Sequence, residues 1–358
     1  MFEPRDQIRA MSGYHSPQVD VPIRLNTNES PFAPPEEWLR QLEGIVSTID
    51  WNRYPDRSAT ELRRTIAHRH GVRPEQVFVA NGSNEVIQAI LLAYGGAGRK
   101  VATFEPTYQM YAQIARVTGA QVVEGERQPD LTLDVAEIER VVQEHQPSVT
   151  FLCNPNNPTG LVEPEHNLRA LLKIATGIVV VDEAYAEFSD WSAMELVSDD
   201  VPLAVTRTFS KTLSMAALRV GYVVAPEWII KNLEIAALPY HLDAFKQAAT
   251  IAALSFTDEM ETRVATIKSE RSRIQTSLRE LNLEVWESGS NFILFRASGK
   301  PAIEVWQTLL DQGVLNRGNV GFRCGIDVVN DRTVRQLPIG HSDGLLQLQR
   351  GIAHQRSV

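Results

Sequence analysis

The stretch GIVVVDEAY, residues 177–185, is an unbroken apolar run that ends in two carboxylates, an alanine and a tyrosine. Runs of the same apolar character lie on either side of it in the chain, SVTFLC at 148–153 and LAVTRTF at 203–209. Strands that are apolar along their whole length are typical of parallel sheets, because helices cover both faces of such a sheet. The stretch therefore predicts a central strand of an α/β fold.

Further strand patterns lie outward from these three, at 76–80, 100–105, 120–125 and 219–225. Helical patterns separate most of them, and this alternation predicts a mostly parallel sheet with helices on both faces. A long charged segment with a helical pattern, 243–282, is expected to bridge to a smaller α/β unit.

The expected domain organisation has three parts. Residues 1–35 are rich in proline, asparagine and other polar residues, which predicts an extended arm rather than a packed core. We expect an N-terminal arm at 1–28, a large domain at 29–242, and a bridging helix with a small C-terminal domain at 243–358. A chain of 358 residues has ample length for two domains.

Composition excludes several classes of protein. The net charge of −9 argues against a nucleic-acid partner, which a basic patch would normally accompany. Cys153 and Cys324 are the only cysteines, so no disulfide framework is expected, and their spacing fits no zinc site; we expect no metal. The chain start lacks the apolar core of a secretory signal, and no apolar run reaches the roughly 18 residues of a membrane span. A cytoplasmic protein with no membrane contact is expected.

Two polar clusters follow predicted strands, where ligands bind in open parallel sheets. NGSNE at 81–85 opens a helix, so the backbone N–H groups near Ser83 and Asn84 can receive an anion. A glycine turn with a capping side chain is the alternative. NPNNPTG at 154–160 has prolines that fix the backbone and present asparagine side chains as rigid hydrogen-bonding groups.

Asp182 ends the apolar strand of the opening stretch. A carboxylate there is costly unless it is paired, so a helix cap, a salt bridge or a cationic ligand is expected beside it. A ring nitrogen that carries a proton is one such cation. Tyr185, three residues later, can place a phenol on the same ligand.

RTFSKTLSMAALRVGY at 207–222 puts Lys211 among hydroxyl residues and Arg219 eight positions later. An arginine suits bidentate contact with a phosphate, and a lysine that loses its proton is a nucleophile. Taken singly, such a lysine is most simply an exposed one. Taken together, an amine, an anion site and an acid at neighbouring strand ends match the requirements of pyridoxal 5'-phosphate.

At this point the chain resembles the fold-type I pyridoxal-phosphate aminotransferases, and among them the histidinol-phosphate aminotransferase family. The matching stretches are LNTNESPFAPP (25–35), NRYPD (52–56), NGSNE (81–85), EPTYQMY (105–111), CNPNNPTG (153–160), DEAYAEF (182–188), RTFSKTLSMAALRVGY (207–222), SNFILFR (290–296) and GVLNR (313–317). The resemblance implies a large domain with a mostly parallel seven-stranded sheet flanked by helices, and a smaller C-terminal α/β domain.

The resemblance also implies roles for individual residues. Lys211 would form the internal aldimine with the cofactor, and Asp182 would pair with its ring nitrogen. Asn157 and Tyr185 would bind the ring oxygen, and Tyr108 would stack on the ring. The phosphate would be held by Ser83, Asn84, Thr208, Ser210 and Arg219. Tyr54 would reach the phosphate of a neighbouring subunit, which implies a homodimer.

The implied reaction converts histidinol phosphate and 2-oxoglutarate to imidazole acetol phosphate and glutamate, in histidine biosynthesis, with ping-pong kinetics. Tyr14, Arg317 and Arg335 would bind the substrate. Arg335 is the best candidate for a second substrate arginine and Arg323 a weaker one, because the likeness to the family stops after residue 317. Divergence of this end is one interpretation, and a shifted reading frame is another, which sequencing of the coding DNA separates.

Three other functions stay open. An aromatic amino acid aminotransferase would share the scaffold, and a decarboxylase of a phosphorylated amino acid has similar sequences. A non-catalytic cofactor-binding module, such as the sensor half of a transcription regulator, is disfavoured because no basic helix-turn-helix segment precedes residue 25. One local departure concerns Ser214 and Ala217, which stand where glycines are common in the family.

Overall fold

The large sheet has seven strands, in a computed structural model that describes residues 2–13, 16–319 and 323–327. Its order is β2-β8-β7-β6-β5-β3-β4, and β8 alone runs against its neighbours. The strands are β2 Val77–Ala80, β3 Lys100–Glu105, β4 Gln121–Glu126, β5 Val149–Cys153, β6 Ile178–Asp182, β7 Leu203–Thr208 and β8 Gly221–Val224. The predicted mostly parallel seven-stranded sheet is confirmed.

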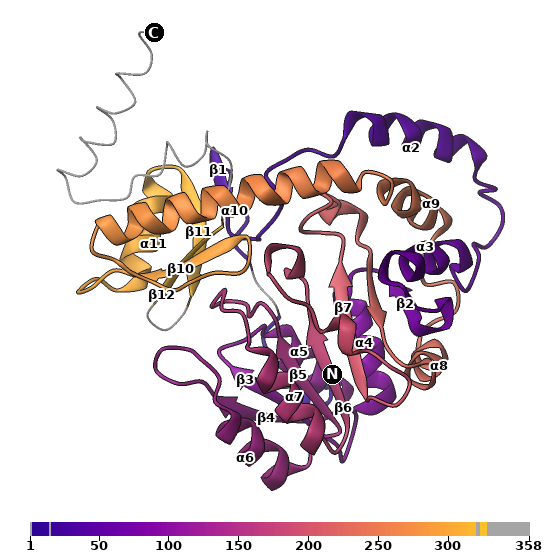
Figure 1. The fold of residues 1–358 in the computed structure, drawn as a ribbon, viewed down its shortest axis with the longest axis horizontal. Helices are drawn as coiled ribbons and strands as arrows, with labels where there is room; N and C mark the ends of the chain where they lie inside the picture. Colours follow the sequence, from indigo (N-terminus) through magenta and orange to yellow (C-terminus); the bar gives the residue numbers. More distant parts are fainter. Residues whose placement is uncertain (1, 14–15, 320–322, 328–358) are drawn as a thin grey trace.

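Helices cover both faces of this sheet, which explains the apolar strands (Figure 1). The side chains of β6 alternate between two cores: Ile178 and Val180 pack on one face, and Val179 and Val181 on the other. One face is covered by α4 Ser83–Tyr94, α5 Met110–Thr118 and α8 Glu227–Ala236. The other face is covered by α3 Thr60–His70, α6 Val135–His145 and α7 Glu165–Ile174. Each buried Val or Ile contributes about 1.5–3 kcal/mol of hydrophobic free energy.

The smaller sheet has the order β1-β11-β12-β10-β9. Its strands are β1 Ile23–Leu25, β9 Glu284–Val285, β10 Phe292–Arg296, β11 Val314–Asn319 and β12 Arg323–Asp327, with helix α11 Ala302–Asp311 against it. No described residue before Ile23 is buried, as expected of an N-terminal arm, and the end of this arm forms β1. A short helix, α1 Asp6–Arg9, precedes β1, which pairs in parallel with β11 and buries Leu25.

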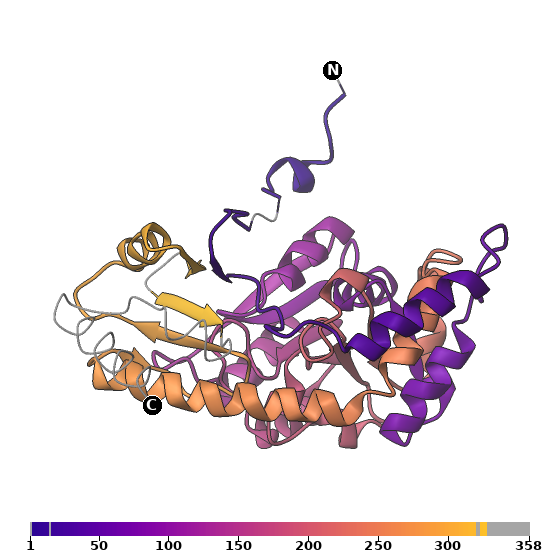
Figure 2. The ribbon, with the colours of Figure 1, turned by 90° about the horizontal axis from the view of Figure 1, so that it is seen from above.

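Two helices, not one, occupy the predicted bridging segment. After α2 Glu36–Thr48 and the large domain come α9 Ala244–Ala253 and α10 Thr257–Glu280, separated at residues 254–256. Figure 2 shows α10 running along the molecule from the large sheet to the small one. Among the residues that the structure describes, no helix combines the length and the apolar composition needed to cross a bilayer.

The strand ends set where the side chains of interest meet. Strands β5, β6 and β7 are parallel, with Cys153 beside Asp182 and Asp182 beside Thr206 in the register. The pairing of β1 with β11 places the residues after Leu25 next to Arg317. Ligands bind beyond the carboxyl ends of strands in such sheets. Residues from both sheets therefore lie together at the carboxyl ends of β5, β6 and β7.

Candidate active site

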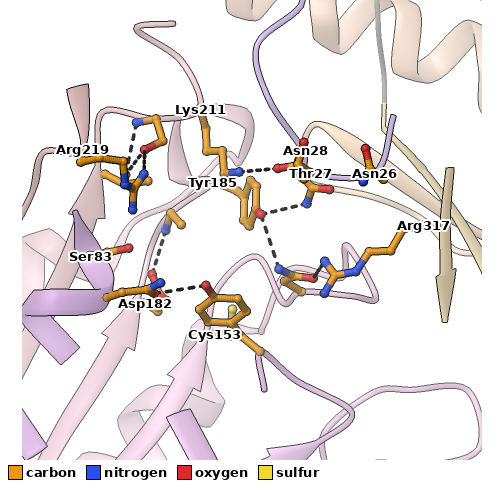
Figure 3. Close-up of a pocket in the computed structure, with 16 residues that line it drawn as sticks. Asn26, Thr27, Asn28, Ser83, Cys153, Asp182, Tyr185, Lys211, Arg219 and Arg317 are labelled. Carbon is orange, nitrogen blue, oxygen red and sulfur yellow. Dashed lines mark hydrogen bonds between the residues drawn. The ribbon is translucent and has the colours of Figure 1, made fainter. Parts of the chain in front are cut away.

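A cavity with about 720 Å³ between its lining atoms, part of it open to solvent, lies at the carboxyl ends of β5, β6 and β7 (Figure 3). The structure brings to it these sequence-predicted residues: Ser83, Asn84, Tyr108, Asn157, Asp182, Tyr185, Thr208, Ser210, Lys211, Arg219 and Arg317. Asn26, Thr27, Asn28, Cys153 and Ala184 also line it.

Lys211 points into the cavity from the turn that follows β7. Its Nζ donates a hydrogen bond to the carbonyl oxygen of Thr27 at 2.9 Å and lies 5.8 Å from the centre of the Tyr185 ring. The amine is therefore held at the centre of the cavity by the segment that follows β1. A nucleophilic amine needs such a fixed position within reach of a bound carbonyl.

Tyr185 is held from two sides through its hydroxyl. Asn28 Nδ2 donates to it at 2.9 Å, and Asn157 Nδ2 at 3.5 Å. Arg317 Nη1 in turn donates to Asn157 Oδ1 at 3.3 Å. The small sheet, through β11, thus reaches the same polar cluster as the large sheet (Figure 3).

Asp182 lies at the floor of the cavity and is almost fully buried. Burial raises the pKa of its carboxyl above the ordinary value, and hydrogen bonds to it oppose this shift. Tyr111 Oη donates to Oδ2 at 2.7 Å, and Thr206 Oγ1 and the Ala184 N–H donate to Oδ1 at 3.1 and 3.2 Å. The hydrogen bonds described for this carboxylate come from neutral donors, so a cation at the cavity floor would find an available negative charge.

A second corner of the cavity fits an anion. Gly82 has φ +80°, and a Cβ built on it would lie 2.6 Å from Arg219 Nη2. A Cβ on Gly221 would lie 2.4 Å from the Ser83 nitrogen. Only glycines allow Arg219 and strand β8 to approach the first turn of α4 this closely, where N–H groups and the helix dipole favour negative charge.

Hydroxyl groups complete this corner. Arg219 Nη1 donates to Ser210 Oγ at 3.2 Å, and Thr208 Oγ1 donates to the same oxygen at 3.0 Å. Donors from β7, its following turn and the start of α4 therefore converge. This donor set has the chemistry of a phosphate site, with an arginine for charge and hydroxyls and N–H groups for direction.

Three predicted residues are not among the described residues that line the cavity. Tyr54 is 81% exposed and stacks on Tyr240, with ring centroids 4.6 Å apart, rather than lining the cavity of its own chain. Tyr14 and Arg335 lie outside the residues that the structure describes. The implied contact of Tyr54 with a neighbouring subunit stays a prediction.

Sequence reasoning missed four contributors, Thr27, Asn28, Tyr111 and Thr206. The first two stand in the LNTNESP stretch, which marks the resemblance without giving these residues a role, and Thr27 acts through its backbone. Tyr111 ends the EPTYQMY stretch, three residues after Tyr108. Tyr108 lies in the turn that leads into α5, where its carbonyl accepts a hydrogen bond from the Tyr111 N–H, and the two rings meet edge to face at 5.4 Å. The three-residue spacing is the signal that could have found Tyr111.

Comparison with known proteins agrees with this geometry. A family model described as "Aminotransferase class I and II" matches residues 20–335. A histidinol-phosphate aminotransferase of Thermobifida fusca is 43% identical over 321 residues, 87% of each chain. That of Corynebacterium diphtheriae is 40% identical over 323 residues, covering 87% of this chain and 88% of its own.

A solved structure of similar fold extends the comparison. Histidinol-phosphate aminotransferase from Sinorhizobium meliloti, in complex with pyridoxal-5'-phosphate, has a TM-score of 0.85 at 22% identity and covers 98% of this chain and 99% of its own. That likeness supports the predicted fold-type I architecture of two α/β domains. Because the family model matches residues 20–335, which are most of this chain, the chain belongs to the class I and II aminotransferases.

Proposed function

We propose that this chain is a pyridoxal-phosphate-dependent histidinol-phosphate aminotransferase, with 2-oxoglutarate as amino acceptor. The observation that carries the proposal is the convergence of Lys211, Asp182 and the Arg219 corner on one cavity. Amine, carboxylate and anion site are the three groups that hold this cofactor. The choice of substrate rests on the relatives that are named histidinol-phosphate aminotransferases and are 40% and 43% identical over most of the chain.

The residues present fit the cofactor. Ser83, Ser210, Thr208 and Arg219 would hold its phosphate, Asp182 its ring nitrogen, and Asn157 and Tyr185 its ring oxygen. When bound, the cofactor supplies an aldehyde for the amino group and a ring that accepts electrons from the substrate's α-carbon. The buried carboxylate of Asp182 would stabilise the protonated, positively charged form of the ring nitrogen, because opposite charges attract strongly where water is excluded.

Lys211 has two tasks in this site. Its Nζ would hold the cofactor covalently. The same nitrogen would also act as the base that takes the proton from the substrate's α-carbon and as the acid that later gives it back. The hydrogen bond from Lys211 Nζ to the Thr27 carbonyl, at 2.9 Å, would hold the amine beside Tyr185, whose ring centre is 5.8 Å away.

Arg317 is proposed to bind the acidic end of either substrate. It reaches the cavity from β11 and contacts Asn157, so it stands on the far side of the site from the phosphate corner. A guanidinium donates paired N–H hydrogen bonds to a phosphate or to a carboxylate, which suits a site that alternates between a phosphorylated amine and a dicarboxylic acid.

We also infer a homodimer in the cytoplasm. Tyr54 stacks on Tyr240, and Trp51 and Leu238, which lie within three residues of them in the sequence, are exposed too; we call these four residues the exposed apolar cluster. A second copy of the chain is the partner that the family resemblance implies for Tyr54. Cys153, the cysteine whose side chain the structure describes, is buried and unbridged, which fits a reducing compartment.

The test is spectroscopic. Purified protein loaded with pyridoxal 5'-phosphate is expected to absorb near the visible range, to lose that band when histidinol phosphate is added, and to regain it with 2-oxoglutarate. Lys211→Ala should abolish turnover. Retained turnover in that variant contradicts the assignment. Faster turnover of phenylalanine indicates the aromatic alternative, and release of carbon dioxide without any need for 2-oxoglutarate indicates the decarboxylase.

A further inference from the structure

Tyr111 connects two side chains that face the proposed cofactor. Its hydroxyl makes the shortest of the hydrogen bonds described to Asp182, 2.7 Å to Oδ2. Its ring contacts Tyr108 edge to face at 5.4 Å, and Tyr108 Oη donates to Asn84 Oδ1 at 3.1 Å. A continuous set of contacts therefore runs from the carboxylate at the cavity floor to the first turn of α4.

The position of Tyr111 is fixed by packing. The side chain is fully buried on α5, and its ring stacks on Phe151 of β5 with centroids 4.5 Å apart and planes 4° apart. Stacking of this kind restricts the ring to one orientation, so the hydroxyl has one place to point. β5 neighbours β6, which carries Asp182, and the donor and acceptor are therefore set by adjacent strands.

The hydroxyl keeps its proton. Burial, together with the nearby Asp182, raises the pKa of Tyr111 well above its ordinary value. Cys153, which also lies beside this pair, has its pKa raised to about 12 by burial and stays a neutral thiol. The phenol is therefore a permanent donor to a buried carboxylate, and such a bond favours the charged form of that carboxylate.

We propose that Tyr111 is a positioning residue for the transamination reaction: its hydroxyl orients Asp182 and sustains its negative charge, while its ring edge fixes Tyr108. This inference rests on the proposed function. It predicts that loss of one oxygen atom weakens the hold on the cofactor's ring nitrogen and slows the chemical step more than it weakens substrate binding. A purely structural tyrosine would do neither.

Tyr111→Phe is the test variant, because phenylalanine preserves the stacking on Phe151. The matched control is Tyr222→Phe. Tyr222 is also buried, its hydroxyl lies 2.8 Å from His70 Nε2, and it is not one of the described residues that line the cavity. Both variants lose one buried, hydrogen-bonded hydroxyl, and only the first lies beside Asp182.

The first measurement uses cofactor-free protein. Urea unfolding of wild type, Tyr111→Phe, Asp182→Asn and the double variant forms a double-mutant cycle. At a pH above the folded pKa of Asp182, where its carboxyl is charged, we expect Tyr111→Phe to lower the folded-to-unfolded ratio about 10-fold more in the wild-type background than in the Asp182→Asn background, as for a charge-assisted hydrogen bond. If Tyr111→Phe alone does not fold, the double variant is expected to fold. Additive losses, or a double variant that also fails to fold, contradict the proposal.

The second measurement uses pyridoxal 5'-phosphate itself and the loaded enzyme. For Tyr111→Phe we expect the cofactor dissociation constant to rise about 10-fold and kcat to fall about 10- to 100-fold, with KM within about twofold. Tyr222→Phe should match wild type in all three. Equal behaviour of the two variants overturns the inference. A wild type that binds no pyridoxal 5'-phosphate would instead sink the proposed function, and the cofactor-free cycle would still test the contact with Asp182.

Discussion

Ser214 has a left-handed backbone conformation, φ +56°, in the turn that follows Lys211. Its hydroxyl donates to Ser30 Oγ at 2.9 Å and receives a hydrogen bond from Arg263 Nη1 at 3.2 Å. The conformation costs a residue with a Cβ roughly 1–2 kcal/mol, which glycine avoids. The serine thus has a less favourable backbone conformation than glycine would have, and its hydroxyl links the N-terminal segment to α10.

Two substitutions separate these contributions. Ser214→Gly and Ser214→Ala both remove the hydroxyl, and only glycine relieves the backbone. We expect the glycine variant to be more stable than the alanine variant by about 1 kcal/mol, measured as the free energy of urea unfolding. Equal stability of the two would mean that the left-handed backbone costs nothing here.

Asp182 gives a pH dependence that should be visible in cofactor-free protein. Burial raises the pKa of its carboxyl, so the folded chain keeps a proton at pH values where the unfolded chain has lost it. The contribution of Asp182 to the free energy of unfolding is then largest below the pKa that this carboxyl has in the unfolded chain. It falls as the pH rises toward the higher pKa of the folded chain. Relative to Asp182→Asn, wild type should lose at most about 1.4 kcal/mol per pH unit in this window.

The comparison with the Asp182→Asn variant cancels the other buried carboxyls, which both chains share. Thermal or urea unfolding between about pH 4 and pH 8 measures the difference in stability. A difference that stays constant, or that grows in favour of wild type as the pH rises, is incompatible with a carboxyl whose pKa is raised by burial.

At the scale of single residues, the sequence indicates groups that carry charge or react, and misses those that act through geometry. Lys211, Asp182 and Arg219 stand out because an ionisable side chain after an apolar strand needs an explanation. The Thr27 carbonyl carries no sequence signal, because every residue has a carbonyl. The hydroxyl of Tyr111 looks like any core tyrosine until its distance to Asp182 is known.

At the scale of elements, the ends of β6 and β7 are held together by a buried ion pair. Arg207 Nε donates to Glu183 Oε2 at 2.9 Å, and its Nη1 donates to Glu187 at 3.0 Å. Glu183 also receives hydrogen bonds from Ser192 and from the Ala193 N–H. This cluster fixes the turn between Asp182 and Glu187, which carries Tyr185.

Arg207→Met should therefore be strongly destabilising, because it leaves Glu183 buried without its partner. We expect a loss of about 3–5 kcal/mol near neutral pH in urea unfolding. Burial already raises the pKa of Glu183 against the opposing effect of Arg207, so the loss should shrink at mildly acidic pH, where the carboxyl can take a proton.

The control for this prediction is an arginine in a surface pair. Arg140 on α6 bonds Glu137 and Glu144 with its side chain about half exposed, and Arg140→Met should leave the unfolding midpoint nearly unchanged. If the two substitutions cost the same, the buried cluster does not hold the β6 and β7 ends.

Element types were predictable because the strand and helix periods differ and most strands of the large sheet are buried on both faces. Two elements were not. The break between α9 and α10 at 254–256 has no glycine or proline to mark it. Strand β1 is too short to show a period, and it exists because β11, far along the chain, offers its edge.

At the scale of the whole molecule, the single chain does not explain why Trp51, Tyr54, Leu238 and Tyr240 are exposed. Aromatic residues at 69% and 81% exposure, Trp51 and Tyr54, are typical of association surfaces. A closed dimer with two-fold symmetry would cover the cluster on both copies at once. If Tyr54 also completes the partner's phosphate corner, neither chain has a complete site alone.

Mixing two defective variants tests this sharing. Lys211→Ala lacks the essential amine, and Tyr54→Ala lacks the residue given to the partner. In a hybrid dimer, the subunit with Tyr54→Ala keeps its Lys211 and receives an intact Tyr54, so one of its two sites is complete. Random exchange of subunits makes about half of all dimers hybrid, and about a quarter of all sites should then match wild type.

The expected result is activity of the unfolded and refolded mixture near a quarter of the wild-type value, with each variant alone far below it. Size-exclusion chromatography at assay concentration checks that the mixture is dimeric. The matched control pairs Lys211→Ala with Tyr94→Ala, which changes a tyrosine outside the exposed cluster and should only dilute the activity of the second variant. A dimeric mixture of the first pair whose activity is merely the average of its components would show that each site is built from one chain.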